Sequence, residues 1–229
     1  MGLNAKKVQG NNGNRVEQAV LEPGVYPARL VQIIDLGLQA QRPYQGKDKA
    51  PVQEIMLTYE LVDAFMVDED GNEITDKPRW VSETLPFYGL AADKAKSTQR
   101  YNALDPSGAL DGDFSRALDT PINVTLVNNI SGEKVYTNVA NIAAMRPRDA
   151  GNCPPLVNPT KCFDLDNPDL EVFNSLPEWL QTKIKSNLNF AGSALEAAFS
   201  GGKAKTEKAP QKKREAPKEE DSEDEDNPY

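Results

Sequence analysis

The chain has 229 residues, a formal net charge of −9 and no histidine. That length fits one ordinary domain with appendages, and the lack of histidine removes the commonest general base and metal ligand, which argues against most enzymes. No stretch approaches the 18 consecutive apolar residues of a membrane-spanning helix, so we expect a cytoplasmic, non-enzymatic protein without cofactor or metal.

The first part of the chain predicts a polar arm followed by two strands. Residues 1–22 are rich in Gly, Asn and Lys and lack periodicity, which predicts a flexible arm. A strand is expected from Val25 to Leu36, with its apolar side chains on one face, and after a basic loop a second strand from Val52 to Val62. The expected apolar face of the first strand consists of Tyr26, Ala28, Leu30, Ile34 and Leu36.

The middle of the chain predicts a third strand, a helix and a hairpin. The strand is expected from Arg79 to Phe87 and the helix from Leu90 to Leu104. Two more strands, Ile122 to Val127 and Lys134 to Ile142, form a hairpin around a turn at 128–133, with one apolar and one polar face.

A helix between the third and fourth of five strands is the arrangement of an OB barrel. The expected fold class is therefore mainly β (α+β), a five-stranded OB-like antiparallel barrel with C-terminal helices over residues 23–200. A small β-sandwich would give the same pattern, so that alternative stays open.

The segment 147–171 reads as an irregular connection rich in Pro, Asn and Asp. Its cysteines, Cys153 and Cys162, do not have the spacing of a CxxC metal knuckle, and free thiols are expected rather than a disulfide. A capping box at Ser175 and Glu178 predicts a helix over 175–188, and a short second helix follows from Ser193 to Phe199. The apolar stripe of the first helix, expected in the core or between two copies of the chain, is Leu176, Trp179, Leu180, Ile184 and Leu188.

Residues 201–229 change composition abruptly. The stretch 203–218 carries seven basic and two acidic residues, and 219–226 carries seven acids in eight positions. Such a segment cannot bury enough apolar surface to offset chain entropy, so we expect a disordered tail. A solubility device is one interpretation, but the terminal aromatic ring favours a docking peptide, whose acids steer it to basic surfaces. The expected partner-binding residues are Glu219, Glu220, Asp221, Glu223, Asp224, Glu225, Asp226 and Tyr229.

The OB-like core, the acidic tail and the terminal aromatic together resemble the single-stranded DNA-binding proteins of bacteriophages and, more loosely, those of bacteria. The stretches GVYPARLVQIIDLG (24–37) and RWVSETLPF (79–87) also look like such phage proteins. The resemblance covers residues 24–145 and 203–229. It implies sequence-independent binding and protection of single-stranded DNA during phage replication or recombination, in the host cytoplasm. It further implies that the tail recruits replication or recombination proteins and competes with DNA.

Binding of single strands without sequence preference needs cations along the backbone and aromatic faces for the bases. Basic residues occur near aromatic ones in the loop after the first strand, around the third strand and on the last hairpin, and the 90–104 helix adds cations. The expected DNA-binding residues are Arg42, Tyr44, Lys47, Lys49, Arg79, Trp80, Tyr88, Lys94, Lys96, Arg100, Lys134, Tyr136 and Arg146.

Several of these residues also have a plainer interpretation. Trp80 fits the core, because aromatic side chains dominate barrel interiors, and Tyr136 fits either a stacking or a structural role. The cations of the 90–104 helix would serve equally as a solvated face. Tyr44, in a basic loop with no core to join, favours exposure and stacking.

Three other functions compete with DNA binding. Residues 1–202 contain 19 Lys and Arg against 26 Asp and Glu, and an acidic domain is an awkward DNA binder unless its cations gather on one side. An acidic protein-binding adaptor or DNA mimic explains that charge better. A nuclease would need a metal held by carboxylates of the 147–171 connection, and a virion or scaffold component is the third rival. The carboxylates considered for the metal are Asp164, Asp166, Asp169 and Glu171.

Overall fold

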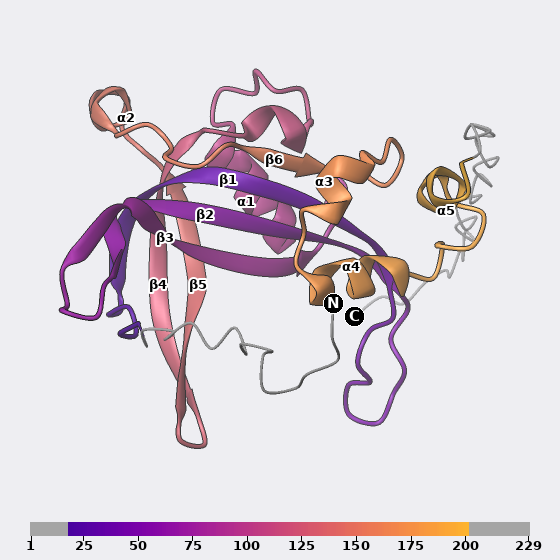
Figure 1. Cartoon of the computed structure of the whole chain (residues 1–229). Coiled ribbons are helices and arrows are strands. Elements are labelled where there is room, and N and C mark those ends of the chain that lie inside the picture. Colours follow the sequence, from indigo (N-terminus) through magenta and orange to yellow (C-terminus); the bar gives the residue numbers. More distant parts are fainter. Residues whose placement is uncertain (1–17, 202–229) are drawn as a thin grey trace, which may run out of the picture.

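The computed structural model describes residues 18–201, and most of the predicted arm and tail lies outside the described residues. The fold is mainly β with short helices, as the sequence predicts (Figure 1). The strands are β1 (Gly24–Gln39), β2 (Val52–Val67), β3 (Glu73–Pro86), β4 (Pro121–Ser131), β5 (Lys134–Ala144) and β6 (Lys161–Phe163). The helices are α1 (Lys96–Leu104), the 3-10 helix η2 (Phe114–Ala117), α2 (Pro147–Asn152), α3 (Leu170–Asn174), α4 (Glu178–Lys185) and α5 (Ala194–Phe199).

Five strands form one antiparallel sheet in the order β3-β2-β1-β4-β5, and the short β6 adds a parallel pairing to β1. In Figure 1, β4 and β5 run across the direction of β1–β3, so the sheet is strongly bent. No backbone ladder joins β3 to β5 within residues 18–201, and the sheet is therefore open.

The first hydrophobic core lies on the inner face of this bent sheet, against α1 and η2. Strand residues supply most of it, because alternate side chains point to the same face. Its largest members include Leu30, Leu57, Tyr59, Leu61, Leu85, Tyr101, Leu104, Phe114, Ile122 and Leu126.

β1 is buried on both faces, whereas the sequence predicted only one apolar face. Leu30 pairs with Tyr59 and Gln32 with Thr58, so Val31 is an extra residue that interrupts the register. Such a bulge re-aims the side chains that follow it. The prediction that Ile34 shares a face with Leu30 is therefore wrong, because Leu30 lies in the first core and Ile34 in a second one.

The second core joins the outer face of β1 and β2 to the C-terminal segment. Figure 1 shows β6, α3 and α4 along this side of β1. We call the segment from β6 to α5 the C-terminal layer. The connection predicted to be irregular thus contributes a strand and two helices. The second core consists of Ile34, Leu36, Met56, Phe163, Phe173, Leu176, Leu180, Ile184 and Leu195.

The helix predicted over 175–188 is wrong in its bounds, because only α4 lies within that range and the separate helix α3 ends at Asn174. Ser175 ends α3 and donates from its hydroxyl to the Val172 carbonyl, so it does not cap α4, whose N-cap is Pro177. Trp179 and Leu188 of the expected stripe are exposed. The helix predicted from Ser193 is confirmed as α5, where the Ser193 hydroxyl accepts from the Glu196 N–H.

Two other predicted boundaries are wrong. The helix expected from Leu90 begins only at Lys96, because Leu90 is exposed and residues 89–95 form turns instead. The turn expected at 128–133 is mostly strand, since Ser131 pairs with Lys134 across a two-residue turn. Gly132, at a φ of 62°, permits that turn. The β4–β5 hairpin therefore extends as an arm beyond the core (Figure 1).

A buried arginine spans the gap between the two edges of the sheet. Arg100, on α1, is only 1% exposed. Its Nε donates to Glu83 Oε1 on β3 at 2.8 Å, its Nη1 to Asn141 Oδ1 on β5 at 2.8 Å, and its Nη2 to the Ala140 carbonyl at 3.1 Å. The expectation that Arg100 lies on an exposed helix face is wrong, because its guanidinium is buried and bridges β3 to β5. Its burial offers no support for the predicted contact with DNA.

Glu83 is the acceptor at the centre of this bridge. It also accepts from the Tyr59 hydroxyl at 2.8 Å and pairs with Lys96 Nζ at 2.9 Å. Burial alone would raise the pKa of the Glu83 carboxyl, but the hydrogen bonds from Arg100 and Lys96 outweigh it and hold the pKa below its ordinary value. The carboxylate is therefore charged throughout the neutral range.

Replacing Arg100 should destabilise the fold strongly. Arg100→Met leaves Glu83 buried and partly uncompensated, which costs about 3–5 kcal/mol for a broken buried pair. Urea unfolding measures the loss. The double variant Arg100→Met, Glu83→Leu should recover part of it, since no buried charge then lacks its partner. A single variant within about 1 kcal/mol of the wild type would contradict a bridging role.

The same carboxylate should make stability depend on acid. Because the folded-state pKa of Glu83 lies below the ordinary value of 4.5, its ionisation stabilises the fold fully above that value. The stabilisation is lost as the pH falls through the folded-state pKa. Urea unfolding from neutral pH down to about pH 3 measures the free energy of unfolding at each pH. This free energy should fall less on acidification in Glu83→Gln than in the wild type. Equal losses in the two proteins would contradict this assignment.

Candidate nucleic-acid interface

The outer face of β3 is one part of the sheet that the C-terminal layer leaves uncovered. Val81, Glu83 and Leu85 point inward and are buried, and the residues between them point outward and are exposed. We call Trp80, Ser82 and Thr84 the outer row of β3. This row gives the molecule an exposed strand surface beside the covered β2.

Trp80 stands at one end of the outer row, 41% exposed, and does not lie in the first core. Its indole N–H donates to Glu60 Oε2 at 2.9 Å. The buried Glu60 also accepts from the Val157 N–H at 2.6 Å and from the Asn158 amide at 2.7 Å. Glu60 thus fixes the ring against the segment that leads into the C-terminal layer, with an aromatic face still open to solvent.

The β1–β2 loop lies at the other end of the outer row. Tyr44 and Lys47 exchange backbone hydrogen bonds of 2.9 and 3.0 Å, which forms a small turn at the tip. The Tyr44 ring is 60% exposed, and Lys49 Nζ lies 4.7 Å from its centroid. The loop therefore presents an aromatic ring and cations to solvent. Arg42 is exposed in the same loop.

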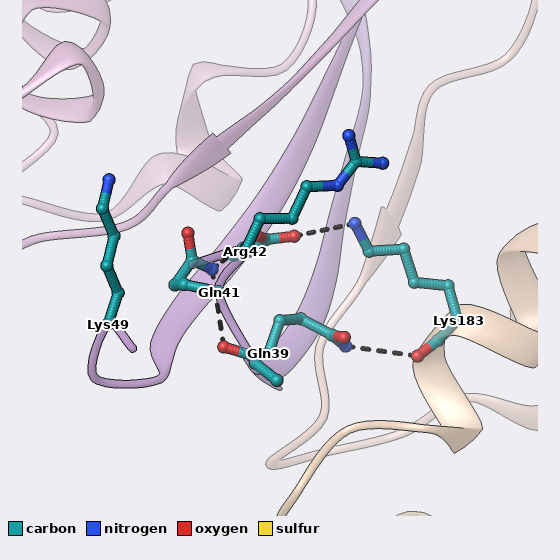
Figure 2. Close-up of a pocket in the computed structure, with 7 residues that line it drawn as sticks. Gln39, Gln41, Arg42, Lys49 and Lys183 are labelled. Atoms are coloured by element: carbon teal, nitrogen blue, oxygen red, sulfur yellow. Dashed lines mark hydrogen bonds and ion pairs between the residues drawn. The ribbon is translucent and has the colours of Figure 1, made fainter. Parts of the chain in front are cut away.

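A polar pocket of about 360 Å³ lies between this loop and α4. Lys183 Nζ forms an ion pair with Glu54 Oε2 at 2.7 Å, and the Gln41 amide donates to Glu54 Oε1 at 2.9 Å. Figure 2 shows Arg42, Lys49 and Lys183 around this space. We call it the loop–α4 pocket, and its lining is Gln39, Ala40, Gln41, Arg42, Lys49, Glu54 and Lys183.

Sequence reasoning identified Arg42 and Lys49 but missed the remaining polar lining. Lys183 comes from a helix far along the chain, and nothing in its own pattern places it beside the loop. Glu54 lies within the second predicted strand, and no local signal marks it as the partner of a distant lysine. The second core brings the two together, because it packs α4 against the outer face of β1 and β2.

The other predicted cations near β3 have protein partners or stand apart. Arg79 is half-buried and donates to the Ala19 carbonyl at 2.9 Å. Lys96 pairs with Glu83. Lys94 is exposed just before α1. Tyr88 is exposed and follows β3, with its backbone N–H donating to the Ser97 hydroxyl at 3.1 Å.

The last group of predicted residues lies elsewhere on the molecule. Lys134 and Tyr136 are exposed near the tip of the β4–β5 arm. Arg146 precedes α2 and pairs with Asp149 at 2.8 Å. Figure 1 shows the arm tip and α2 at opposite ends of the view, and both are separate from the β1–β2 loop. The predicted residues are therefore not gathered in one site.

Two of the four carboxylates considered for a metal accept hydrogen bonds from the nearby backbone. Asp164 accepts from the Asp166 N–H at 2.9 Å, and Asp169 caps α3 by accepting from the Glu171 N–H at 2.8 Å. Within residues 18–201 no three His, Cys, Asp or Glu side chains converge as metal ligands.

The same described range contains no helix that is long and apolar enough to cross a membrane. Cys153 and Cys162 are free thiols, as expected, and burial is the main cause that raises the pKa of each.

Comparison with known proteins identifies no relative: no family model matches the chain, and no curated protein matches it either. Function therefore has to be inferred from the geometry of this chain.

Proposed function

We propose that the chain binds single-stranded DNA without sequence preference, and that its sheet is an OB-like barrel left partly open. The strand order β3-β2-β1-β4-β5 with α1 between β3 and β4 supports the OB assignment. In OB folds the face of the second and third strands and the loop between the first two strands bind oligonucleotides. Those parts of this chain carry the exposed rings and cations.

The observation that carries the proposal is the alignment of the loop–α4 pocket with the outer row of β3. The cross-strand pairs Glu54–Pro86 and Glu60–Trp80 belong to one uninterrupted register, so both ends lie on the same face. The six residue steps from Pro86 to Trp80 span roughly 20 Å at about 3.3 Å per residue. A single strand on this surface would meet the Tyr44 ring and the pocket cations at one end and the Trp80 ring at the other.

The net charge of −9 weighs against any nucleic-acid binder, because phosphate neutralisation supplies most of the affinity. The pocket offsets this locally. Arg42, Lys49 and Lys183 contribute three positive charges there against the one negative charge of Glu54. Acidic groups more than about 10 Å away are largely screened at moderate salt, so a local excess of cations suffices for binding.

We further propose that the acidic segment 219–226 and Tyr229 recruit replication or recombination proteins and compete with DNA. This segment lies outside the described residues, and its composition and its resemblance to phage tails support the proposal. The same acids that dock on a basic partner would occupy the chain's own cationic surface when DNA is absent.

An acidic protein-binding adaptor is the second candidate. It is favoured by the overall charge and by the arm, where Ile130 is 77% exposed and lies opposite the exposed Val135. An apolar pair at the end of a protruding hairpin suits a protein contact.

Titration of a fluorescent oligo-dT with the full chain and with a 1–202 truncation tests the proposal against this rival. We expect the logarithm of the association constant to fall linearly with the logarithm of the salt concentration. The slope should be roughly 0.7 per phosphate contact. We also expect tighter binding after truncation, because the competing acids are removed. If neither protein binds, single-strand binding is excluded and the adaptor becomes the leading function.

Tyr44 should act through its ring. Tyr44→Ala should weaken oligo-dT binding by about 1–3 kcal/mol, the usual contribution of a stacked base, whereas Tyr44→Phe should bind as the wild type does. Fluorescence titration at fixed salt measures both variants. An unchanged affinity in Tyr44→Ala would show that no base stacks on this loop.

A further inference from the structure

We propose that the loop–α4 pocket is a phosphate-binding site, and that Lys183 of the C-terminal layer is one of its ligands. The inference rests on the proposed function, because it assigns the pocket to a backbone phosphate of the bound single strand. It extends the binding surface beyond the sheet and its loops to a helix that is not part of a five-stranded barrel.

The chemistry of the lining selects a phosphate over a base. No aromatic and only one small apolar side chain, Ala40, lines the pocket, so it offers a base neither a stacking face nor an apolar wall. Arg42 and Lys49 have no carboxylate within ion-pair distance among the described residues. Their charges are therefore available to an anion.

Lys183 is held in place before any ligand arrives. Its carbonyl accepts from the Gln39 amide at 3.2 Å, and its ammonium pairs with Glu54 at 2.7 Å, as the dashed lines in Figure 2 mark. An ammonium has three N–H donors, so one is used by Glu54 and the others remain for phosphate oxygens. Fixing the side chain in advance lowers the entropy lost on binding.

Glu54 has two opposing effects in this arrangement. It positions Lys183, but its negative charge also repels a phosphate. With Arg42, Lys49 and Lys183 charged, the pocket carries a local charge of +2, and without Glu54 it would carry +3. Glu54→Gln keeps an amide oxygen that can accept from Lys183 and removes the repulsion.

The neighbouring ring suits the nucleotide that follows the phosphate. Lys49 lines the pocket and also lies over the Tyr44 ring at 4.7 Å. A strand with its phosphate in the pocket can therefore place the adjoining base on Tyr44. The β1–β2 loop would then contact both the phosphate and the base of a nucleotide.

The first arm of the experiment compares charge-matched variants in oligo-dT titrations over a range of salt. Lys183→Gln and Arg42→Gln should each lower the salt slope by about 0.7 and weaken binding roughly three- to ten-fold at ~0.1 M salt. Lys77→Gln removes the same charge from an exposed position at the opposite end of the β2–β3 ladder and should change neither. Glu54→Gln should bind several-fold more tightly, an effect that damage to the fold would not produce.

Arg42 lies in an exposed loop, so its variant tests the pocket even if Lys183→Gln unfolds. Unchanged salt slopes in both cation variants, or a loss of affinity equal to that of Lys77→Gln, would overturn the proposal while leaving single-strand binding intact.

The second arm reads the site directly in the full-length wild-type protein by lysine acetylation and mass spectrometry. Oligo-dT should protect Lys183 and Lys49 but not Lys77, and unprotected Lys183 in the DNA complex would overturn the assignment. Inorganic phosphate is the parallel probe. If oligo-dT does not bind but inorganic phosphate protects Lys183, the pocket is a phosphate site and the proposed function fails. If oligo-dT does not bind and neither ligand protects Lys183, both proposals fail. If oligo-dT binds without protecting Lys183, only the assignment of the pocket fails.

Discussion

The ion pair between Arg100 and Glu83 is the interaction on which the rest of the architecture depends. An open sheet has two edges whose spacing no backbone ladder controls, and here a side chain from α1 reaches both. A buried charge is tolerated only when it is paired and hydrogen-bonded, and this guanidinium has partners on β3 and β5 together. The backbone ladder with β2 positions β3 in the sheet, and the Arg100 contact holds its distance from β5.

The bulge in β1 has a comparable effect on the other face of the sheet. One extra residue at Val31 turns Ile34 and Leu36 outward, where they need an apolar cover. The C-terminal layer provides that cover and is therefore an integral part of the domain. It also leaves the outer face of β3 free and brings Lys183 beside Glu54. The candidate site is thus a by-product of how the second core is packed.

The sequence was sufficient for strands β1 to β5 and for the presence of a helix between β3 and β4, because alternation and turn residues are local signals. It was insufficient where a residue from another element determines whether a side chain is buried or which helix it caps. A cation on a short helix reads as solvated, and only the carboxylate of a separate strand explains why Arg100 is buried. The Ser175–Glu178 spacing fitted an N-terminal capping box, yet Ser175 is the C-cap of the preceding helix α3. Tyr44 was placed correctly outside the core, because its loop lacks apolar neighbours.

Net charge is a poor guide to what this surface can bind. The acids of the chain and the cations of the pocket act over different distances, since exposed charges are screened beyond about 10 Å in ordinary salt. Glu54, at 2.7 Å from Lys183, is the acid whose charge the pocket experiences most directly. Distant acids instead lower the association rate, because they repel an approaching polyanion. Under the proposed function, an acidic chain with a small cationic pocket would release its ligand readily, because its affinity would rest on few contacts that salt or the proposed competing segment 219–226 could displace.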